Sequence, residues 1–251
     1  RGMPADSVMK MLYRILDIEP DYTKARLQIL QILVQRGDMG RVAEVCHEGE
    51  LYDPSEVTFY YYEGEAQYRA GKNESAIHTL QRGAERIDEQ TDPLIASHVY
   101  APLAQGLHDS RPNAEAYLAY ERSLEFNPMN LFCLNNYAYF LAVDGTELEK
   151  AERMSRLTVE APGADATFFD TYAWILYRMK EYEKARIYID EALRTLPFTA
   201  ENASVIDHAG DIYFYCKDRA KAVEFWRRAL EVSTDRELTQ QLRRKLRRRR
   251  P

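Results

Sequence analysis

Apolar positions along most of the chain fall into helical segments of about 13 residues that are separated by short polar or glycine-containing breaks. Residues 170–193, DTYAWILYRMKEYEKARIYIDEAL, show the pattern well and read as two consecutive short helices. Ala, Leu, Glu, Arg and Lys, which favour helices, are abundant, whereas Gly accounts for only 11 of 251 residues. The pattern therefore predicts an all-α protein built from short helices.

Prolines and small residues repeat with a period of about 34 residues. Successive prolines are separated by 34, 74, 34 and 35 residues, and the gap of 74 equals two repeats with a six-residue insertion: Pro20, Pro54, Pro128, Pro162 and Pro197. Small residues keep nearly the same spacing: Ala76, Ala116, Ala151, Ala185 and Ala222. Each period contains two helical segments, and a fixed period of this length is typical of a helical repeat array.

The residues at fixed places in each period resemble the tetratricopeptide repeat (TPR). In the fifth period these residues are Phe169, Tyr172, Ala173, Leu176, Ala185, Ile189, Ala192 and Pro197. In the sixth period they are Ile206, Ala209, Gly210, Tyr213, Ala222, Trp226 and Ala229. The last three periods look similar to a run that is common in bacterial TPR proteins. The resemblance implies an all-α fold, a right-handed TPR superhelix (α-solenoid) of antiparallel helix pairs.

The expected organisation is a single TPR array over residues 1–251. Residues 3–20 match only the second helix of a repeat, and full repeats follow at 21–55, 56–95, 96–129, 130–164, 165–201 and 202–234. Residues 235–251 form a basic C-terminal helix or tail. Because a lone second helix cannot bury its apolar face, and because the chain begins Arg1-Gly2-Met3, we expect a fragment whose array extends further towards the N-terminus.

One side of the first helix in each repeat is expected to line the concave groove of a TPR protein. Asp170, Trp174 and Tyr177 share such a side, because their spacing is i, i+4, i+7. The corresponding residues of the second, fourth and sixth repeats are Tyr61, Glu65, Tyr68, Asn135, Tyr139, Asp207, Asp211 and Phe214. Two interpretations stay open: these side chains bind a peptide, or the aromatic ones pack between repeats and the acidic ones are solvated.

The expected groove is aromatic and acidic, which favours a partner segment with basic and apolar side chains. Some TPR proteins bind the acidic C-termini of chaperones with Lys, Asn and Arg. The matching positions here hold Asp170, Asp207, Asp211, Trp174 and Glu65, which does not fit such a ligand. The unpaired N-terminal helix is a possible surface for homo-oligomer formation.

Charge is unevenly distributed along the chain. The net charge is −6, and residues 236–250 contain eight basic residues and one acidic residue, so the rest of the chain carries −13. Leu238, Leu242 and Leu246 form an apolar stripe in this segment, which suits a helix that caps the last repeat. The alternatives are a disordered tail or a basic arm that binds anionic lipid or nucleic acid through Arg243, Arg244, Lys245 and Arg247.

No catalytic or metal-binding motif is found. The three cysteines and five histidines have no metal-ligand spacing, so we expect reduced structural thiols and no cofactor or metal. No apolar run approaches the ~18 residues of a membrane span, and the mildly negative net charge makes nucleic acid an unlikely partner.

The sequence thus predicts a non-enzymatic protein–protein interaction scaffold that binds an extended or helical segment. The alternatives are a structural or assembly spacer that uses terminal or convex surfaces, and a binder of anionic lipid or nucleic acid through the tail. Localisation rests on the resemblance alone: many similar bacterial TPR proteins are exported and tethered to the envelope, which the resemblance favours here for a periplasmic or lipid-anchored parent protein, and the alternative is the cytoplasm.

Overall fold

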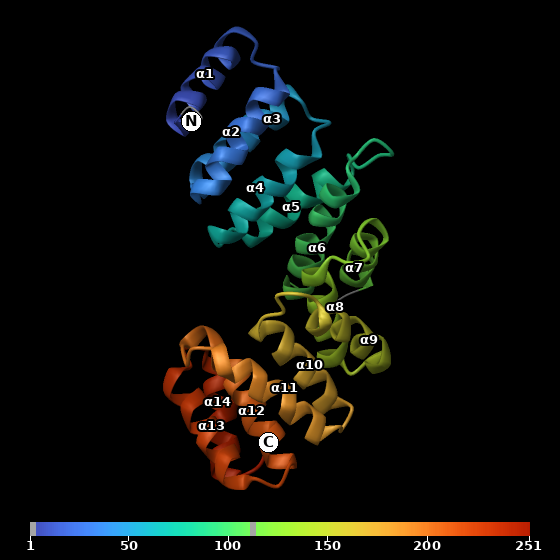
Figure 1. Ribbon diagram of the computed structural model, residues 1–251, viewed down its shortest axis with the longest axis vertical. Helices are drawn as coiled ribbons and strands as arrows, with labels where there is room; N and C mark the ends of the chain where they lie inside the picture. The colour runs from blue at the N-terminus through green and yellow to red at the C-terminus, as the bar shows by residue number, and fades with distance from the viewer. Residues whose placement is uncertain (1–3, 111–113) are drawn as a thin grey trace. The chain divides into compact units, whose positions relative to one another are not determined.

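The computed structural model describes residues 4–110 and 114–251, and within these ranges it contains helices and no strands (Figure 1). The chain divides into two compact units, unit 1 from Arg1 to Cys133 and unit 2 from Leu134 to Pro251. In the part of the chain that is described, no helix is both long enough and apolar enough to cross a lipid bilayer.

Unit 1 contains seven helices and the start of an eighth in its described residues. They are α1 Ala5–Ile18, α2 Thr23–Arg36, α3 Met39–Tyr52, α4 Val57–Arg69, α5 Asn73–Ala84, α6 Pro93–Ser110, α7 Ala114–Phe126 and the beginning of α8 Leu131–Asp144. Helices α2 and α3, α4 and α5, and α6 and α7 pack as pairs, and α1 packs on α2. The range 21–55 holds α2 and α3, whereas α6 begins at Pro93, inside the expected range 56–95.

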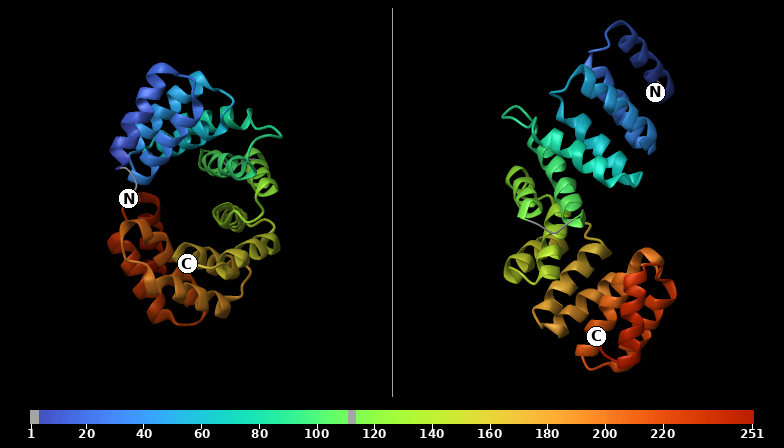
Figure 2. Two further views of the ribbon diagram at one scale, coloured as in Figure 1. Left: turned by 45° about the horizontal axis from the view of Figure 1, so that its top comes forward. Right: turned by 180° about the vertical axis from the view of Figure 1, so that it is seen from behind.

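Unit 2 holds most of α8 and the remaining helices. These are α9 Leu148–Glu160, α10 Ala166–Arg178, α11 Tyr182–Thr195, the short 3₁₀ helix η1 Ala200–Asn202, α12 Ala203–Tyr215, α13 Arg219–Val232 and α14 Arg236–Arg248. Helices α10 and α11 pack together, as do α12 and α13, and α14 packs on α13. Both views of Figure 2 show successive helices within a unit lying side by side.

Local sequence explains where these helices begin and turn. The Asp165 carboxylate accepts hydrogen bonds from the backbone N–H groups of Thr167 and Phe168 and so caps the N-terminus of α10. The turns that join paired helices need a left-handed residue, and glycine occupies that place at Gly37, with φ of 70°. Lysine takes this conformation in the last two pairs, at Lys180 and Lys217.

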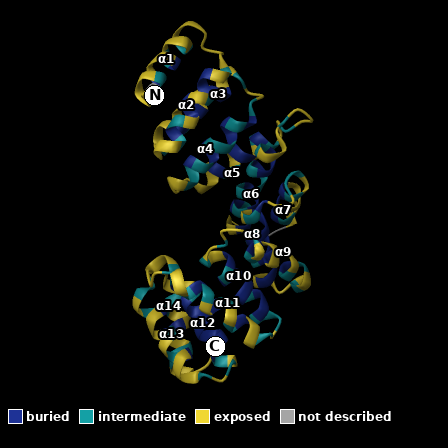
Figure 3. Ribbon diagram, viewed as in Figure 1, coloured by how far each residue is buried: buried dark blue, intermediate teal, exposed yellow. Residues whose placement is uncertain are grey.

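Buried and exposed residues alternate along the helices (Figure 3), and most of the buried residues are apolar. Ala173 on α10 and Ala185 on α11 are fully buried where these helices meet, as the sequence pattern predicts. Gly210 on α12 allows a similar close approach, because a Cβ atom there would lie 2.3 Å from the indole ring of Trp226 on α13. Close helix packing thus fixes the positions of the first helices α10 and α12.

Candidate interaction face

Eight of the predicted site residues lie on three helices of unit 2. We call this set the first-helix face; its members are Asn135 and Tyr139 on α8, Asp170, Trp174 and Tyr177 on α10, and Asp207, Asp211 and Phe214 on α12. Side-chain contacts connect the three helices. The Tyr139 phenol lies near Asp170, and its pKa is raised by burial and by that carboxylate. His208 on α12 contacts both Asp170 and Trp174 on α10.

Trp174 forms the centre of an aromatic row on this face. Its ring stacks on Tyr177, with ring centroids 4.9 Å apart, and on His208, with centroids 4.1 Å apart. The Trp174 and Tyr177 side chains stay partly exposed. The indole Nε1 of Trp174 is buried but donates no hydrogen bond to the protein, which is unusual for a buried indole N–H.

Asp170 and His208 form a buried pair that links α10 to α12. The His208 Nδ1 lies 2.9 Å from the Asp170 Oδ1. Burial opposes a charge on the imidazole, but the carboxylates of Asp170, Asp207 and Asp211 together outweigh this effect and raise the pKa of His208, with Asp170 contributing most of the three. Asp170 therefore has a partner within the chain and is not an open acidic group.

The carboxylates of Asp207 and Asp211 are bound by a lysine of the C-terminal helix. The Lys245 Nζ lies 2.7 Å and 2.8 Å from the two oxygens of Asp207, and 2.8 Å from both oxygens of Asp211. The Trp226 Nε1 also donates to Asp211 Oδ1 at 2.9 Å. Burial and the Asp207 charge raise the pKa of Asp211, and the charge of Lys245 opposes that shift. The acidic end of the first-helix face is thus occupied by the chain itself.

No protein-family model matches the chain, and no curated protein matches it either. Solved structures do match. The chain is similar to the APC/C hetero-tetramer Cut9-Hcn1 with a TM-score of 0.73 and 13% identity, over 97% of this chain and 45% of that one. It therefore spans less than half of the matched Cut9-Hcn1 chain.

Two further matches cover most of both chains. A tetratricopeptide repeat protein from Parabacteroides merdae ATCC 43184 matches with a TM-score of 0.59 and 14% identity, over 96% of this chain and 90% of that one. YrrB, described as a TPR protein with an unusual peptide-binding site, matches with a TM-score of 0.50 and 14% identity, over 93% and 97%. The chain has the tetratricopeptide-repeat fold. The predicted all-α solenoid of antiparallel helix pairs is therefore confirmed.

In a TPR array, the second helix of one repeat is followed by the first helix of the next. Helix α14 takes this place after α13. Leu242 on α14 is fully buried, and Leu238 and Leu246 pack beside it on the last core cluster. Lys245 lies between Leu242 and Leu246 in sequence and points to α12. Of the predicted basic-tail residues, Lys245 is therefore used inside the protein, whereas Arg243, Arg244 and Arg247 are exposed.

Two of the three predicted site residues of unit 1, Tyr61 and Tyr68, make packing contacts between first helices. Tyr61 on α4 stacks on His98 of α6 with ring centroids 5.4 Å apart, and the Tyr68 hydroxyl donates to the Pro102 carbonyl at 3.2 Å. Burial raises the pKa of Tyr61 to about 12 and also raises that of Glu65. In this unit the two tyrosines join α4 to α6.

Unit 1 also contains a second buried acidic pair, formed by Glu50 on α3 and Glu63 on α4. Arg82 on α5 forms an ion pair with Glu50, and the Gln67 Nε2 donates to Glu63 at 2.9 Å. One carboxyl oxygen of each glutamate is buried without a hydrogen-bond partner. Burial, and then the adjacent Glu50 carboxyl group, raise the pKa of Glu63 to about 8. Glu63 is therefore mostly protonated at neutral pH.

The sequence interpretation missed His208, the inward direction of Lys245 and the Glu50–Glu63 pair. One signal was present: Asp170 and His208 are separated by 38 residues, and so are Asp207 and Lys245. Both separations are close to one repeat length. The contacts therefore join equivalent positions on the first helices of neighbouring repeats, α10 with α12 and α12 with α14. A pattern search within single helices cannot reveal such contacts.

The cysteines and other polar groups offer no metal site among the residues that the structure describes. Cys46 and Cys133 are buried and Cys216 is half-buried, all as free thiols. Burial raises the pKa of Cys133 and of Cys216 to about 11, so these thiols are protonated at neutral pH and are poor nucleophiles.

Proposed function

We propose that this protein is a non-enzymatic protein-interaction scaffold that binds an extended or helical segment of a partner on the first-helix face of unit 2. The observation that carries the proposal is the indole N–H of Trp174, which is buried, has no acceptor in the protein and belongs to a partly exposed aromatic row. A small rotation of the Trp174 side chain on binding would bring this N–H to a carbonyl oxygen of the bound segment. The similarity to YrrB, whose description includes a peptide-binding site, supports the same reading.

The proposed contacts come from three neighbouring helices. Trp174, Tyr177, Tyr139 and Phe214 offer aromatic surface at low conformational cost. Asn135 on α8 is almost fully buried, and its Oδ1 accepts no hydrogen bond within the protein. A segment that presents apolar side chains together with its own backbone donors and acceptors would use all of these groups.

The charge balance refines the expected ligand. The sequence favours a basic and apolar segment, but Lys245 already supplies a positive charge to Asp207 and Asp211, and Asp170 is paired with His208. We therefore infer that apolar and aromatic side chains contribute most of the affinity. An interface of roughly 800 Å² per partner and an affinity on the order of micromolar are reasonable for such a segment.

The test is a selection of peptides from a phage-displayed random library against the whole chain, followed by calorimetry with the selected peptides. Trp174→Phe removes the N–H but keeps an aromatic ring, and we expect it to weaken binding by about 1 kcal/mol. Trp174→Ala is expected to weaken binding by about 2 kcal/mol or more. Tyr61→Phe, in unit 1, serves as the matched control and should leave the affinity unchanged. Selected peptides that bind the Trp174 variants as tightly as the original protein would contradict the proposal.

A second candidate function, assembly through the N-terminal helix, is favoured by one observation. Met11, Ile15 and Ile18 lie on one side of α1 and are 53%, 38% and 80% exposed. An apolar stripe of this kind can pair with a second copy of the chain. Sedimentation equilibrium of the original protein and of Ile15→Glu/Ile18→Glu tests it. A monomer at all concentrations would exclude this function, and a dimer that the variant abolishes would support it.

A further inference from the structure

Helix α14 presents two chemically different sides. The inner side consists of Leu238, Leu242, Lys245 and Leu246, which contact α12 and α13. The outer side bears arginines that are solvent-exposed, among them Arg243 and Arg247. Because these two residues are one helical turn apart, their side chains project from the same part of the helix. The outer side is therefore a separate surface from the first-helix face.

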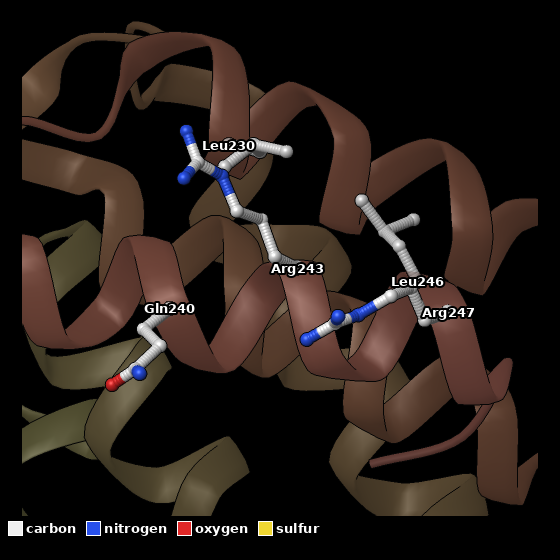
Figure 4. Close-up of a pocket in the computed structure, with 5 residues that line it drawn as sticks. All are labelled: Leu230, Gln240, Arg243, Leu246 and Arg247. Carbon is white, nitrogen blue, oxygen red and sulfur yellow. The ribbon is translucent and has the colours of Figure 1, made fainter.

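A groove with an apolar floor lies between α13 and α14 next to these arginines. It has a volume of about 510 Å³ and is lined by Leu230, Gln240, Arg243, Leu246 and Arg247. Figure 4 shows Arg243 reaching from α14 towards Leu230 on α13, with Leu246 and Arg247 on the next turn. Both leucines are half-buried, so the apolar floor is recessed between the two helices.

The arginines of this groove lack acidic partners, unlike arginines on other helices of the same unit. Arg228 on α13 pairs with Glu224 at 2.7 Å, and Arg194 on α11 pairs with Glu191 at 2.7 Å. Within the described ranges, no carboxylate forms an ion pair with Arg243 or Arg247. Like charges at i and i+4 repel each other across one helical turn. An external group with negative charge would remove this repulsion.

We propose that the α13–α14 groove is a docking site for an acidic amphipathic helix of a partner protein. An apolar side chain of that helix fills the space between Leu230 and Leu246. Carboxylates one turn apart on the same helix then pair with the guanidinium groups of Arg243 and Arg247, which suit bidentate carboxylate binding. A flat anionic membrane fits less well, because its surface cannot reach the recessed leucines. The site does not depend on the function proposed for the first-helix face.

The test uses a fluorescein-labelled, lactam-stapled peptide with leucines along one stripe and glutamates on either side. Fluorescence anisotropy with the whole chain gives its affinity. Arg243→Glu/Arg247→Glu is expected to weaken binding at least about tenfold. Arg244→Glu/Arg248→Glu changes the net charge equally and has the same spacing, but it lies outside the groove and should change the affinity less than about twofold. A peptide of scrambled sequence and vesicles containing phosphatidylglycerol complete the comparison.

The expected result is binding of the amphipathic peptide that depends on Arg243 and Arg247 and that Trp174→Phe leaves intact. Equal losses in the two double variants would overturn the proposal, because they would indicate attraction to net charge alone. Equal binding of the scrambled peptide, stronger binding to vesicles, or no binding up to about 1 mM peptide would also overturn it. Circular dichroism of both double variants verifies that these exposed substitutions leave the helices folded.

Discussion

Unit 1 and unit 2 each bury two carboxyl groups close together, Glu50 with Glu63 and Asp207 with Asp211. In unit 2, one lysine contacts all four carboxylate oxygens of the pair, and an indole N–H adds a further hydrogen bond. In unit 1, Arg82 pairs with Glu50, while Glu63 receives one amide hydrogen bond and lies 3.8 Å from the His47 Nδ1. The Glu50–Glu63 pair is therefore completed by a proton, with the pKa of Glu63 raised to about 8.

The difference shows that a buried acidic residue on a TPR helix does not by itself indicate a binding site. Two ionised carboxylates in a poorly solvated place need a compensating charge, which a basic side chain or a proton can supply. In unit 2 the compensating charge comes from Lys245 on α14. The acidic end of the first-helix face therefore holds α14 against α12. The aromatic row around Trp174 is where hydrogen-bonding capacity remains unused.

The largest expected effect comes from removing the cation of the unit 2 pair. Lys245→Met leaves two buried carboxylates without their partner, and we expect the free energy of unfolding to fall by about 3 kcal/mol. Urea denaturation followed by tryptophan fluorescence measures it, since Trp174 and Trp226, the two tryptophans of the chain, both lie in unit 2. Arg244→Met, on the exposed side of α14, is the control and should cost less than about 0.5 kcal/mol. Equal losses in both variants would contradict the role given to Lys245.

A smaller effect is expected from the protonated pair of unit 1. The pKa of Glu63 is about 8 in the folded protein and 4.5 ordinarily, so the folded state holds its proton more strongly between these values. The free energy of unfolding should therefore fall as pH rises from about 5 to 9, by about 1–2 kcal/mol. Glu63→Gln should remove this part of the pH dependence.

Two signals distinguish the units in that experiment. Urea denaturation at pH 6 and pH 9 is followed by circular dichroism, which reports the whole chain, and by tryptophan fluorescence, which reports unit 2. We expect Glu63→Gln to raise the pH 9 midpoint seen by circular dichroism and to leave the fluorescence midpoint unchanged. Glu85→Gln, at the exposed residue that follows α5, is the control. A pH response that Glu63→Gln leaves intact would show that another group is responsible.

The smallest effect concerns the Asp170–His208 pair beside Trp174. Because the pKa of His208 is raised above 6.5 by Asp170, the pair stabilises the fold fully below pH 6.5 and less as pH rises through the folded-state pKa. Asp170→Asn should lower the pKa of His208 and reduce the free energy of unfolding at pH 6 by about 1 kcal/mol. An NMR titration of the His208 ring protons measures the pKa directly. An unchanged pKa in the variant would exclude Asp170 as its cause.

The sequence was sufficient to predict the fold, because the period of about 34 residues and the small residues at helix crossings report local packing. Ala173, Ala185 and Trp226 are buried as that pattern requires. The division into repeats at the stated boundaries and the residues of the binding face stay predictions. Tyr61 and Tyr68 were expected to line a groove, with packing between repeats as the open alternative, and they make contacts between helices. The spacing of residues along one helix shows that they share a side of that helix. It does not show whether that side faces solvent or another helix.

The electrostatic partners could not be predicted from the pattern within each repeat. Lys245 was taken as one residue of a basic segment, and its neighbours in sequence, Arg244 and Leu246, give no sign that it alone points inward. Its direction follows from the place of α14 after the last repeat, since the helix repeats the contact that α12 makes with α10. Such a contact depends on how successive repeats stack, and only the folded structure reports it.

The most direct test of this account is an NMR titration of the two indole N–H groups with a peptide selected for binding. Trp226 donates to Asp211 inside the protein, whereas Trp174 has no acceptor. We predict that the peptide shifts the Trp174 indole signal and slows its exchange with solvent, while the Trp226 signal stays in place. A peptide that shifts the Trp226 signal alone, or that binds without moving the Trp174 signal, would contradict the assignment of the aromatic row as the binding site.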